Sequence, residues 1–182
     1  AVNMSLGYSL SYNGKSSQVF FQNEDSVYQN SEDIWALVDE IQALTELGVV
    51  CVAASGNSFQ NYQGKDGGVI ITGSGAGDFF WTDQNSQQGV SYPSSIPEVI
   101  SVGSTDFSDN KISVFSQRDD AIQDVFAPGG GITQAAIGGG TVTMGGTSMA
   151  SPYVAGTVLL MQQVAEEELG RKLNTSEIMK II

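Results

Sequence analysis

The chain has 182 residues, of which 41% are apolar and 15% charged, a balance typical of a globular domain with a real core. Its 20 acidic and 7 basic residues give a net charge of −13, which argues against nucleic acid or an anionic membrane surface as a partner. No apolar run approaches the roughly 20 residues that a membrane span requires, so no span is predicted.

The single cysteine and the first residues bound the organisation of the chain. Cys51 excludes an internal disulfide bond, and its place in the apolar run 49–54 predicts a buried strand residue rather than a reactive thiol. The sequence opens on Ala1 with neither an initiator methionine nor a signal peptide. We interpret it as an internal piece of a longer protein, forming a single domain over residues 1–182.

The first third of the chain predicts a strand, a loop, a helix and a second strand. Residues 2–6 form a short apolar strand, and residues 8–30 are polar and without a clean period, which favours a loop. Ser31 is expected to cap a helix that Gly48 ends. Its apolar face comprises Ile34, Leu37, Val38, Ile41, Leu44 and Leu47. Residues 49–54 then read as a strand of a parallel sheet covered on both faces.

Residues 58–90 are polar and rich in glycine, which indicates a long loop with a short strand at 69–72 and an aromatic cluster at 79–81. Asp66, Asp78 and Asp83 lack the spacing of a calcium-binding loop, which favours solvated carboxylates. A structural Ca²⁺ stays an alternative at this point.

The remainder predicts short strands and two helices. A turn bracketed by prolines leads into a buried strand near residues 99–104, and residues 111–115, 124–127 and 141–143 read as further strands. Apolar residues from Val154 to Leu169 recur on a helical period, so we expect a buried and rigid helix. A last helix should start with Thr175 as its cap.

Just before the long helix, the run Gly145-Gly146-Thr147-Ser148-Met149-Ala150-Ser151-Pro152 delivers a hydroxyl to a helix N-terminus. The glycines would allow a sharp turn that strains a residue with a Cβ. A serine held there faces free backbone N–H groups and the positive end of the helix dipole, which stabilise an oxyanion on a substrate carbonyl. Ser148 is therefore our candidate nucleophile.

Four segments resemble the subtilisin-like serine proteases, or subtilases, of peptidase family S8. The most specific is Gly146–Pro152, and the others are Ala54–Asn57, Ser91–Ser104 and Asp124–Gly129. The resemblance implies an α/β fold with three layers, a mostly parallel sheet flanked by helices, incomplete at the N-terminal side. The chain would be the C-terminal portion of a subtilase catalytic domain. The resemblance also implies a cis peptide bond between Tyr92 and Pro93.

The same resemblance assigns roles to individual residues. Ser148 would be the nucleophile, and Asn57 would donate a hydrogen bond to the oxyanion of the tetrahedral intermediate. Protein or peptide substrates would lie along Ser5, Leu6 and Gly7. The facing wall of the first pocket would be Ala54, Ser55 and Gly56, and Thr147 would be a further substrate-binding residue.

The resemblance implies no cofactor for the chemistry. Any structural metal, such as a Ca²⁺ near the turn at Tyr92, should have oxygen ligands. Secretion or a cell-surface location is expected from the family.

The chain lacks a residue that could act as the usual general base for a serine nucleophile. A serine hydroxyl is a poor nucleophile near neutral pH and needs a base, usually a histidine oriented by a carboxylate. The sequence contains no histidine, and Tyr153 stands where the family often has one that is not catalytic. Because subtilisins have the chain order Asp, His, Ser, the missing pair is expected upstream of Ala1.

Three interpretations follow. The parent protein is a serine endopeptidase whose Asp and His lie in an absent upstream segment, in which case this chain alone is inactive. Alternatively, the parent is a noncatalytic subtilase-like binding or structural module that has lost its histidine. In the third, the base is a carboxylate, as in the related sedolisins, although those have Asp where Asn57 stands.

Overall fold

The computed structural model of the chain describes residues 1–6, 9–12, 15–18, 32–57, 90–118 and 123–182. Its main sheet has four strands in the order β1-β4-β5-β6. These are β1 Val2–Met4, β4 Cys51–Ala54, β5 Val99–Asp106 and β6 Val125–Gly130. Every neighbouring pair is parallel, with Val2 beside Cys51 and Cys51 beside Val99. The predicted parallel sheet is therefore confirmed.

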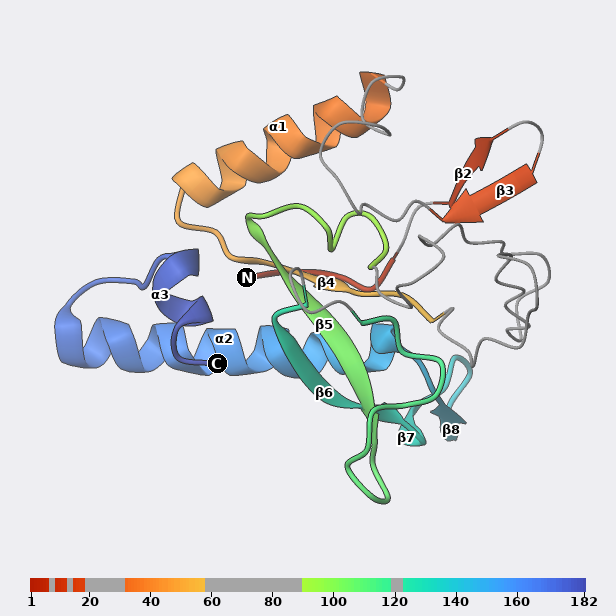
Figure 1. The fold of residues 1–182 in the computed structure, drawn as a ribbon. Coiled ribbons are helices and arrows are strands. Elements are labelled where there is room, and N and C mark those ends of the chain that lie inside the picture. Colours follow the sequence, from red (N-terminus) through yellow and green to blue (C-terminus); the bar gives the residue numbers. More distant parts are fainter. Residues whose placement is uncertain (7–8, 13–14, 19–31, 58–89, 119–122) are drawn as a thin grey trace.

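Two helices lie on opposite sides of this sheet, as Figure 1 shows: α1 Glu32–Glu46 and α2 Thr147–Leu169. Successive side chains of a strand point to opposite faces. On β4 and just before it, Val50 and Val52 join the cluster of buried residues that includes Val154 and Val158 of α2. Cys51 and Ala53 join the cluster that includes Ile41 of α1. The three-layer α/β fold follows from this alternation.

The predictions for Cys51 and for the peptide bond before Pro93 are both confirmed. Cys51 is fully buried in β4, and burial raises the pKa of its thiol, as expected of a structural cysteine. The peptide bond between Tyr92 and Pro93 is cis. The Tyr92 side chain is buried in the cluster on the α1 side of the sheet, so this turn is part of the core.

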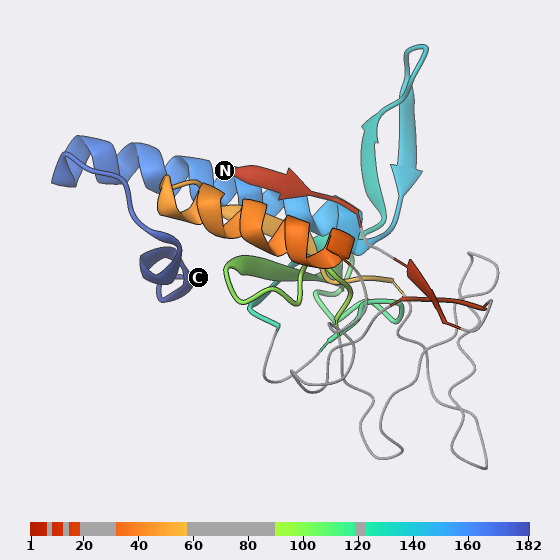
Figure 2. The same cartoon turned by 90° about the horizontal axis from the view of Figure 1, so that it is seen from above.

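Several shorter elements differ from the sequence predictions. The expected loop 8–30 contains an antiparallel hairpin, β2 Ser9–Tyr12 with β3 Lys15–Gln18. A second hairpin, β7 Ile132–Ala135 with β8 Thr141–Met144, projects from the body beside the start of α2 (Figure 2). The strand expected at 111–115 is wrong, because that segment makes only one isolated bridge, from Ile112 to Thr105. The strand at 69–72, the aromatic cluster and the three aspartates of that loop lie outside the described residues.

Both long helices are less buried than their apolar patterns suggested. In α1, which Gly48 ends with a left-handed φ of 75°, the predicted core residue Leu47 is exposed because it lies beyond the last helical residue. In α2, the sheet covers one face only, and Tyr153, Leu160 and Val164 are exposed. The expected burial of this helix therefore holds only for the face that packs on the sheet. Among the described residues, no helix is both long enough and apolar enough to cross a membrane.

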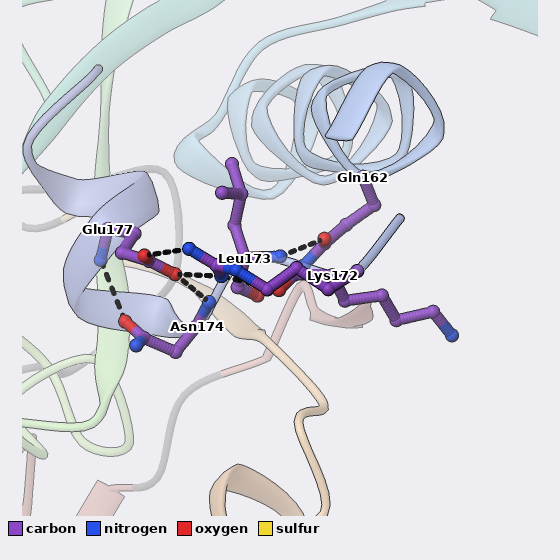
Figure 3. Close-up of polar contacts among 6 residues, drawn as sticks. Gln162, Lys172, Leu173, Asn174 and Glu177 are labelled. Carbon is purple, nitrogen blue, oxygen red and sulfur yellow. Dashed lines mark hydrogen bonds and ion pairs between the residues drawn. The ribbon is translucent and has the colours of Figure 1, made fainter. Parts of the chain in front are cut away.

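The C-terminal end of the structure is fixed by a polar network (Figure 3). Gln162 of α2 donates to the Leu173 carbonyl and accepts from the Leu173 N–H, both at 2.8 Å. Helix α3, Thr175–Met179, is capped by Asn174 rather than by the predicted Thr175. Asn174 Oδ1 accepts from the Glu177 N–H, and Glu177 accepts from the Asn174 N–H, which makes a capping box.

This capping box predicts an acid-sensitive contribution to stability. Hydrogen bonds from Arg171 and then from the Asn174 N–H lower the pKa of Glu177 from 4.5 to about 2. Because the folded state lowers this pKa, the stabilisation is present above pH 4.5 and is lost as the pH falls towards 2. We expect Glu177→Gln to lower the urea midpoint at pH 6, with a difference from the parent sequence that disappears near pH 2. Glu166→Gln, which removes the same charge outside the box, is the control, and a pH-independent difference for Glu177→Gln would contradict this account.

Candidate functional site

The two principal candidate residues lie at the carboxyl edge of the parallel sheet, where open α/β sheets bind their ligands. Asn57 follows the end of β4, and Ser148 is the second residue of α2. The turn before α2 is tied to the end of β6, because the Gly146 N–H donates to the Gly129 carbonyl at 2.9 Å. Residues that are far apart in the sequence therefore meet at one end of the sheet.

The Asn57 side chain is hydrogen-bonded to the first residue of α2. Its Oδ1 accepts from the Thr147 N–H at 2.7 Å and from the Thr147 hydroxyl at 2.9 Å. An N–H can only donate, so the atom of Asn57 that faces it must be the carboxamide oxygen. Asn57 thus satisfies one of the N–H groups that a helix leaves without an internal partner. The exposed Asn57 keeps its Nδ2 amide group as a donor on the other side.

Thr147 also holds the backbone next to Asn57. The Thr147 side chain is fully buried, and its hydroxyl accepts from the Gly56 N–H at 3.1 Å. Gly56 has a left-handed φ of 110°, and a Cβ there would overlap the Gln117 carboxamide and the Ser91 hydroxyl. Only glycine fits this position. Thr147 therefore holds both the Asn57 side chain and the Gly56 backbone in place. The predicted contact of Thr147 with substrate is a different role and stays a prediction.

Ser148 is linked to the strand beside it in two directions. The Ser148 hydroxyl donates to the Ser5 carbonyl at 3.3 Å, and the Ser5 hydroxyl donates to the Ser148 carbonyl at 2.8 Å. The second bond exists because of Pro152, which lies inside α2 four residues after Ser148. Proline has no N–H, so the Ser148 carbonyl lacks its usual partner within the helix. The Ser5 hydroxyl takes that place and fixes the turn that carries Ser148 against the chain just after β1.

Two further residues complete this connection. Asn3 of β1 accepts a hydrogen bond from the Ser151 hydroxyl of α2, and its Nδ2 donates to the Ser5 hydroxyl at 3.0 Å. Sequence reasoning missed Asn3, Ser151 and the role of the Ser5 hydroxyl. The available signal was Pro152, because a proline at this spacing predicts an unpartnered carbonyl at Ser148.

The glycines before Thr147 do not have the left-handed backbone conformation that would make glycine necessary there. Gly146 is extended, with a φ of 160°, and Gly145 is not among the glycines with a left-handed φ. A Cβ on Gly146 would lie 3.4 Å from Asn57 Nδ2. That separation is an ordinary van der Waals contact, so neither a left-handed backbone nor a steric clash explains glycine at this position.

The remaining predicted substrate residues are placed as follows. Leu6 is exposed, Gly7 lies outside the described residues, and the side chains of Ala54 and Ser55 are buried. Ser55 makes internal hydrogen bonds, from its N–H to the Val102 carbonyl and from its hydroxyl to the Gln117 carbonyl. If residues 54–56 line a substrate pocket, they would therefore do so through the shape of their backbone and not through free polar side chains. The pocket itself stays a prediction.

The metal prediction also stays open. Among the described residues, no group of three or more His, Cys, Asp or Glu side chains is placed to hold a metal ion. Asp124 accepts from the Ser101 N–H at 2.7 Å, and burial raises the pKa of its carboxyl.

Thr147→Val tests the support beneath Asn57. Valine keeps the shape but leaves the Gly56 N–H without its acceptor, a loss that costs about 1–3 kcal/mol for a buried group. We expect a fall of this size in the free energy of unfolding, measured by urea titration. Thr157→Val removes an exposed hydroxyl of the same helix, which donates to the Tyr153 carbonyl, and should change stability by no more than about 0.5 kcal/mol. Equal effects of the two substitutions would contradict the support role.

A family model and individual relatives of known name point to the same protein family. A family model described as the subtilase family matches residues 1–181. An intracellular serine protease of Paenibacillus polymyxa is 41% identical over 87 residues, which cover 48% of this chain and 26% of that protein. Subtilisin-like protease 1 of Trichophyton rubrum is 47% identical over 74 residues, which cover 41% of this chain and 14% of that protein. The matches thus cover less than a third of these relatives.

Solved structures extend the likeness to nearly the whole chain. A cold-adapted subtilisin-like serine proteinase is 28% identical, with a TM-score of 0.59 over 98% of this chain and 45% of that one. The prenylagaramide maturation protease PagA has a TM-score of 0.64 over 98% of this chain and 48% of that one. At 24% identity, the latter likeness shows the fold alone. The chain therefore has the subtilisin-like fold and spans about half the length of these structures.

Proposed function

The chain belongs to the subtilase family, and from that premise we propose that its parent protein is a serine endopeptidase acting through an acyl-enzyme. The Ser148 hydroxyl attacks the carbonyl carbon of the scissile bond. The oxyanion that forms accepts hydrogen bonds from Asn57 Nδ2 and from the Ser148 N–H. That N–H belongs to the first turn of α2, where backbone N–H groups have no carbonyl partner inside the helix. Collapse of the tetrahedral intermediate releases the amine, and water then hydrolyses the ester.

The observation that carries this proposal is the orientation of Asn57. Its oxygen is held by both donors of Thr147, so its amide group is left to donate beside the residue that precedes Ser148. A donor fixed before the reaction needs no reorganisation when charge develops on the substrate.

The general base is proposed to come from outside the chain. The sequence has no histidine, and Ser148 donates its proton to the Ser5 carbonyl, which cannot carry it away. We place the histidine and its aspartate in an upstream segment of the parent, of which this chain is the C-terminal catalytic portion. This chain alone is then inactive.

The proposed substrate class is supported by the exposed segment that follows β1 beside Ser148. An extended protein or peptide substrate would lie along Ser5 to Gly7, using main-chain hydrogen bonds that do not depend on side chains. Family likeness extends the proposal to secretion or a cell-surface location. The relative from Paenibacillus polymyxa bears the name of an intracellular protease, so the location needs a direct measurement.

Burst kinetics of the parent protein test this proposal. With an activated peptide ester, acylation should release about one equivalent of leaving group rapidly, followed by slower steady turnover. A parent protein that contains this chain yet shows neither a burst nor peptide hydrolysis would instead be a noncatalytic binding or structural module.

A further inference from the structure

The Asn3 side chain joins two residues near the start of α2. Its Oδ1 accepts from the Ser151 hydroxyl, and its Nδ2 donates at 3.0 Å to the Ser5 hydroxyl oxygen. The Ser5 hydroxyl in turn donates at 2.8 Å to the Ser148 carbonyl. Ser148 and Ser151 are three residues apart, so they lie on the same face of the helix. We call this set of four residues the Asn3 bridge, and it holds α2 to the start of the chain at two points.

Each hydrogen bond of the Asn3 bridge runs in one direction only. A carbonyl can only accept, so the single proton of the Ser5 hydroxyl is committed to Ser148. The Ser5 oxygen is then an acceptor, and Asn3 must present its amide nitrogen there. The carboxamide oxygen of Asn3 consequently faces Ser151, whose side chain is fully buried and whose hydroxyl needs a partner. The direction of the whole bridge is therefore set by the Ser148 carbonyl.

The Asn3 bridge is not required to hold β1 in the sheet, because β1 pairs with β4 over all three of its residues. The Asn3 side chain instead reaches the end of α2 that carries Ser148. There, Pro152 leaves the Ser148 carbonyl without a partner inside the helix. A water molecule could donate to that carbonyl, but it would not tie the carbonyl to the neighbouring chain. The distinctive effect of the bridge is therefore on position.

The Asn3 bridge fixes the place of Ser148 relative to the segment that follows β1. In the proposed reaction, that segment holds the extended substrate, while the Ser148 hydroxyl and N–H act on the substrate carbonyl. Both groups belong to the residue whose own carbonyl the bridge holds. A misplacement of about 1 Å in a reacting group can lower a rate by about 10²-fold. A link between the substrate segment and the nucleophile would keep the two aligned.

We propose that Asn3 is a positioning residue for the proposed reaction, acting through Ser5 on the alignment of Ser148 with the substrate. This proposal rests on the proposed function and adds to it a residue that acts through another side chain. A purely structural asparagine would change stability. A positioning asparagine changes kcat more than KM, because the main chain that binds the substrate is retained.

A double-mutant cycle in the parent protein tests whether Asn3 acts through Ser5. The variants are Asn3→Ala, Ser5→Ala and the two combined, assayed for kcat and KM with a chromogenic peptide and for the thermal midpoint. We expect each single substitution to lower kcat by about tenfold, with KM within about twofold of the parent. The double variant should also lose about tenfold, because either change breaks the same link. Independent effects would multiply to about 100-fold and would overturn the proposal.

Ser151→Ala separates alignment from stability. It releases the other end of Asn3, and it removes a buried hydroxyl in favour of the residue with the highest helix propensity. We expect kcat to fall by at least about threefold while the thermal midpoint stays close to that of the unsubstituted parent. Gln163→Ala removes an exposed carboxamide of α2 that donates to Glu167, and this control should keep kcat.

The outcomes of this experiment are distinct. An unchanged kcat in Asn3→Ala or in Ser151→Ala would overturn the proposal. So would a fall in kcat that only matches a loss of folded protein, which would leave Asn3 a structural residue. In each of these cases an active parent keeps the proposed function standing. An unsubstituted parent that shows neither hydrolysis nor a burst would refute the proposed function and the positioning role together.

Discussion

Replacing Ser148 with alanine in the parent protein is expected to abolish peptide hydrolysis. The substitution removes the hydroxyl that donates from the start of α2 to the Ser5 carbonyl at 3.3 Å. The expected fall in kcat is about 10⁶-fold, a magnitude borrowed from the nucleophile of a subtilisin rather than derived for this chain. The measurement is steady-state hydrolysis of a chromogenic peptide.

The fold should survive this change. The bond from the Ser5 hydroxyl to Ser148 uses the backbone carbonyl, which alanine retains. The thermal midpoint should therefore remain close to that of the unsubstituted parent. Ser176→Ala, an exposed serine of α3, is the control and should keep full activity. Retention of more than a few per cent of activity by Ser148→Ala would assign the nucleophile to another residue.

Replacing Asn57 with aspartate should lower kcat by about 10² to 10³ with little change in KM. That range is the cost of losing an oxyanion-hole donor in a subtilisin and is again borrowed from the family. Aspartate keeps an oxygen for the two Thr147 donors but replaces the Nδ2 amide with a second oxygen. The anchoring is retained while the donor is lost and a negative charge is added beside the developing oxyanion, so the fall in kcat should be at least as large as that range.

The matched comparison is Asn57→Ala. Alanine removes both the donor and the acceptor for the Thr147 N–H, so it should lower stability as well as kcat. Asn57→Asp should lower kcat while leaving the urea midpoint near neutral pH less affected. If Asn57→Asp kept kcat within threefold of the parent, the amide of Asn57 would have no part in stabilising the oxyanion.

The principal elements and the order of the site could be predicted because their signals are local. The continuous apolar run around Cys51 predicts a strand covered on both faces, and the run from Gly146 to Pro152 predicts a serine at a helix start. Both features depend on neighbours in the sequence. The position of Asn57 at the end of a buried strand could be predicted for the same reason.

Other features depend on partners that are distant in the sequence. The hydrogen bonds from Ser5 to Ser148 and from Ser151 to Asn3 join residues more than 140 positions apart. No local pattern specifies them, although Pro152 shows that one carbonyl needs an external donor. The exposure of Leu160 could not be predicted either, because an apolar helical period does not say how many faces of a helix are covered.

The most direct test of the account is mass-spectrometric labelling with a fluorophosphonate, which modifies activated serines. The account predicts a single adduct on Ser148 in the parent protein and none in this chain alone over the same time, since this chain has no histidine. Rapid labelling of Ser148 in the chain alone would contradict it, as would an adduct on any other serine of the parent.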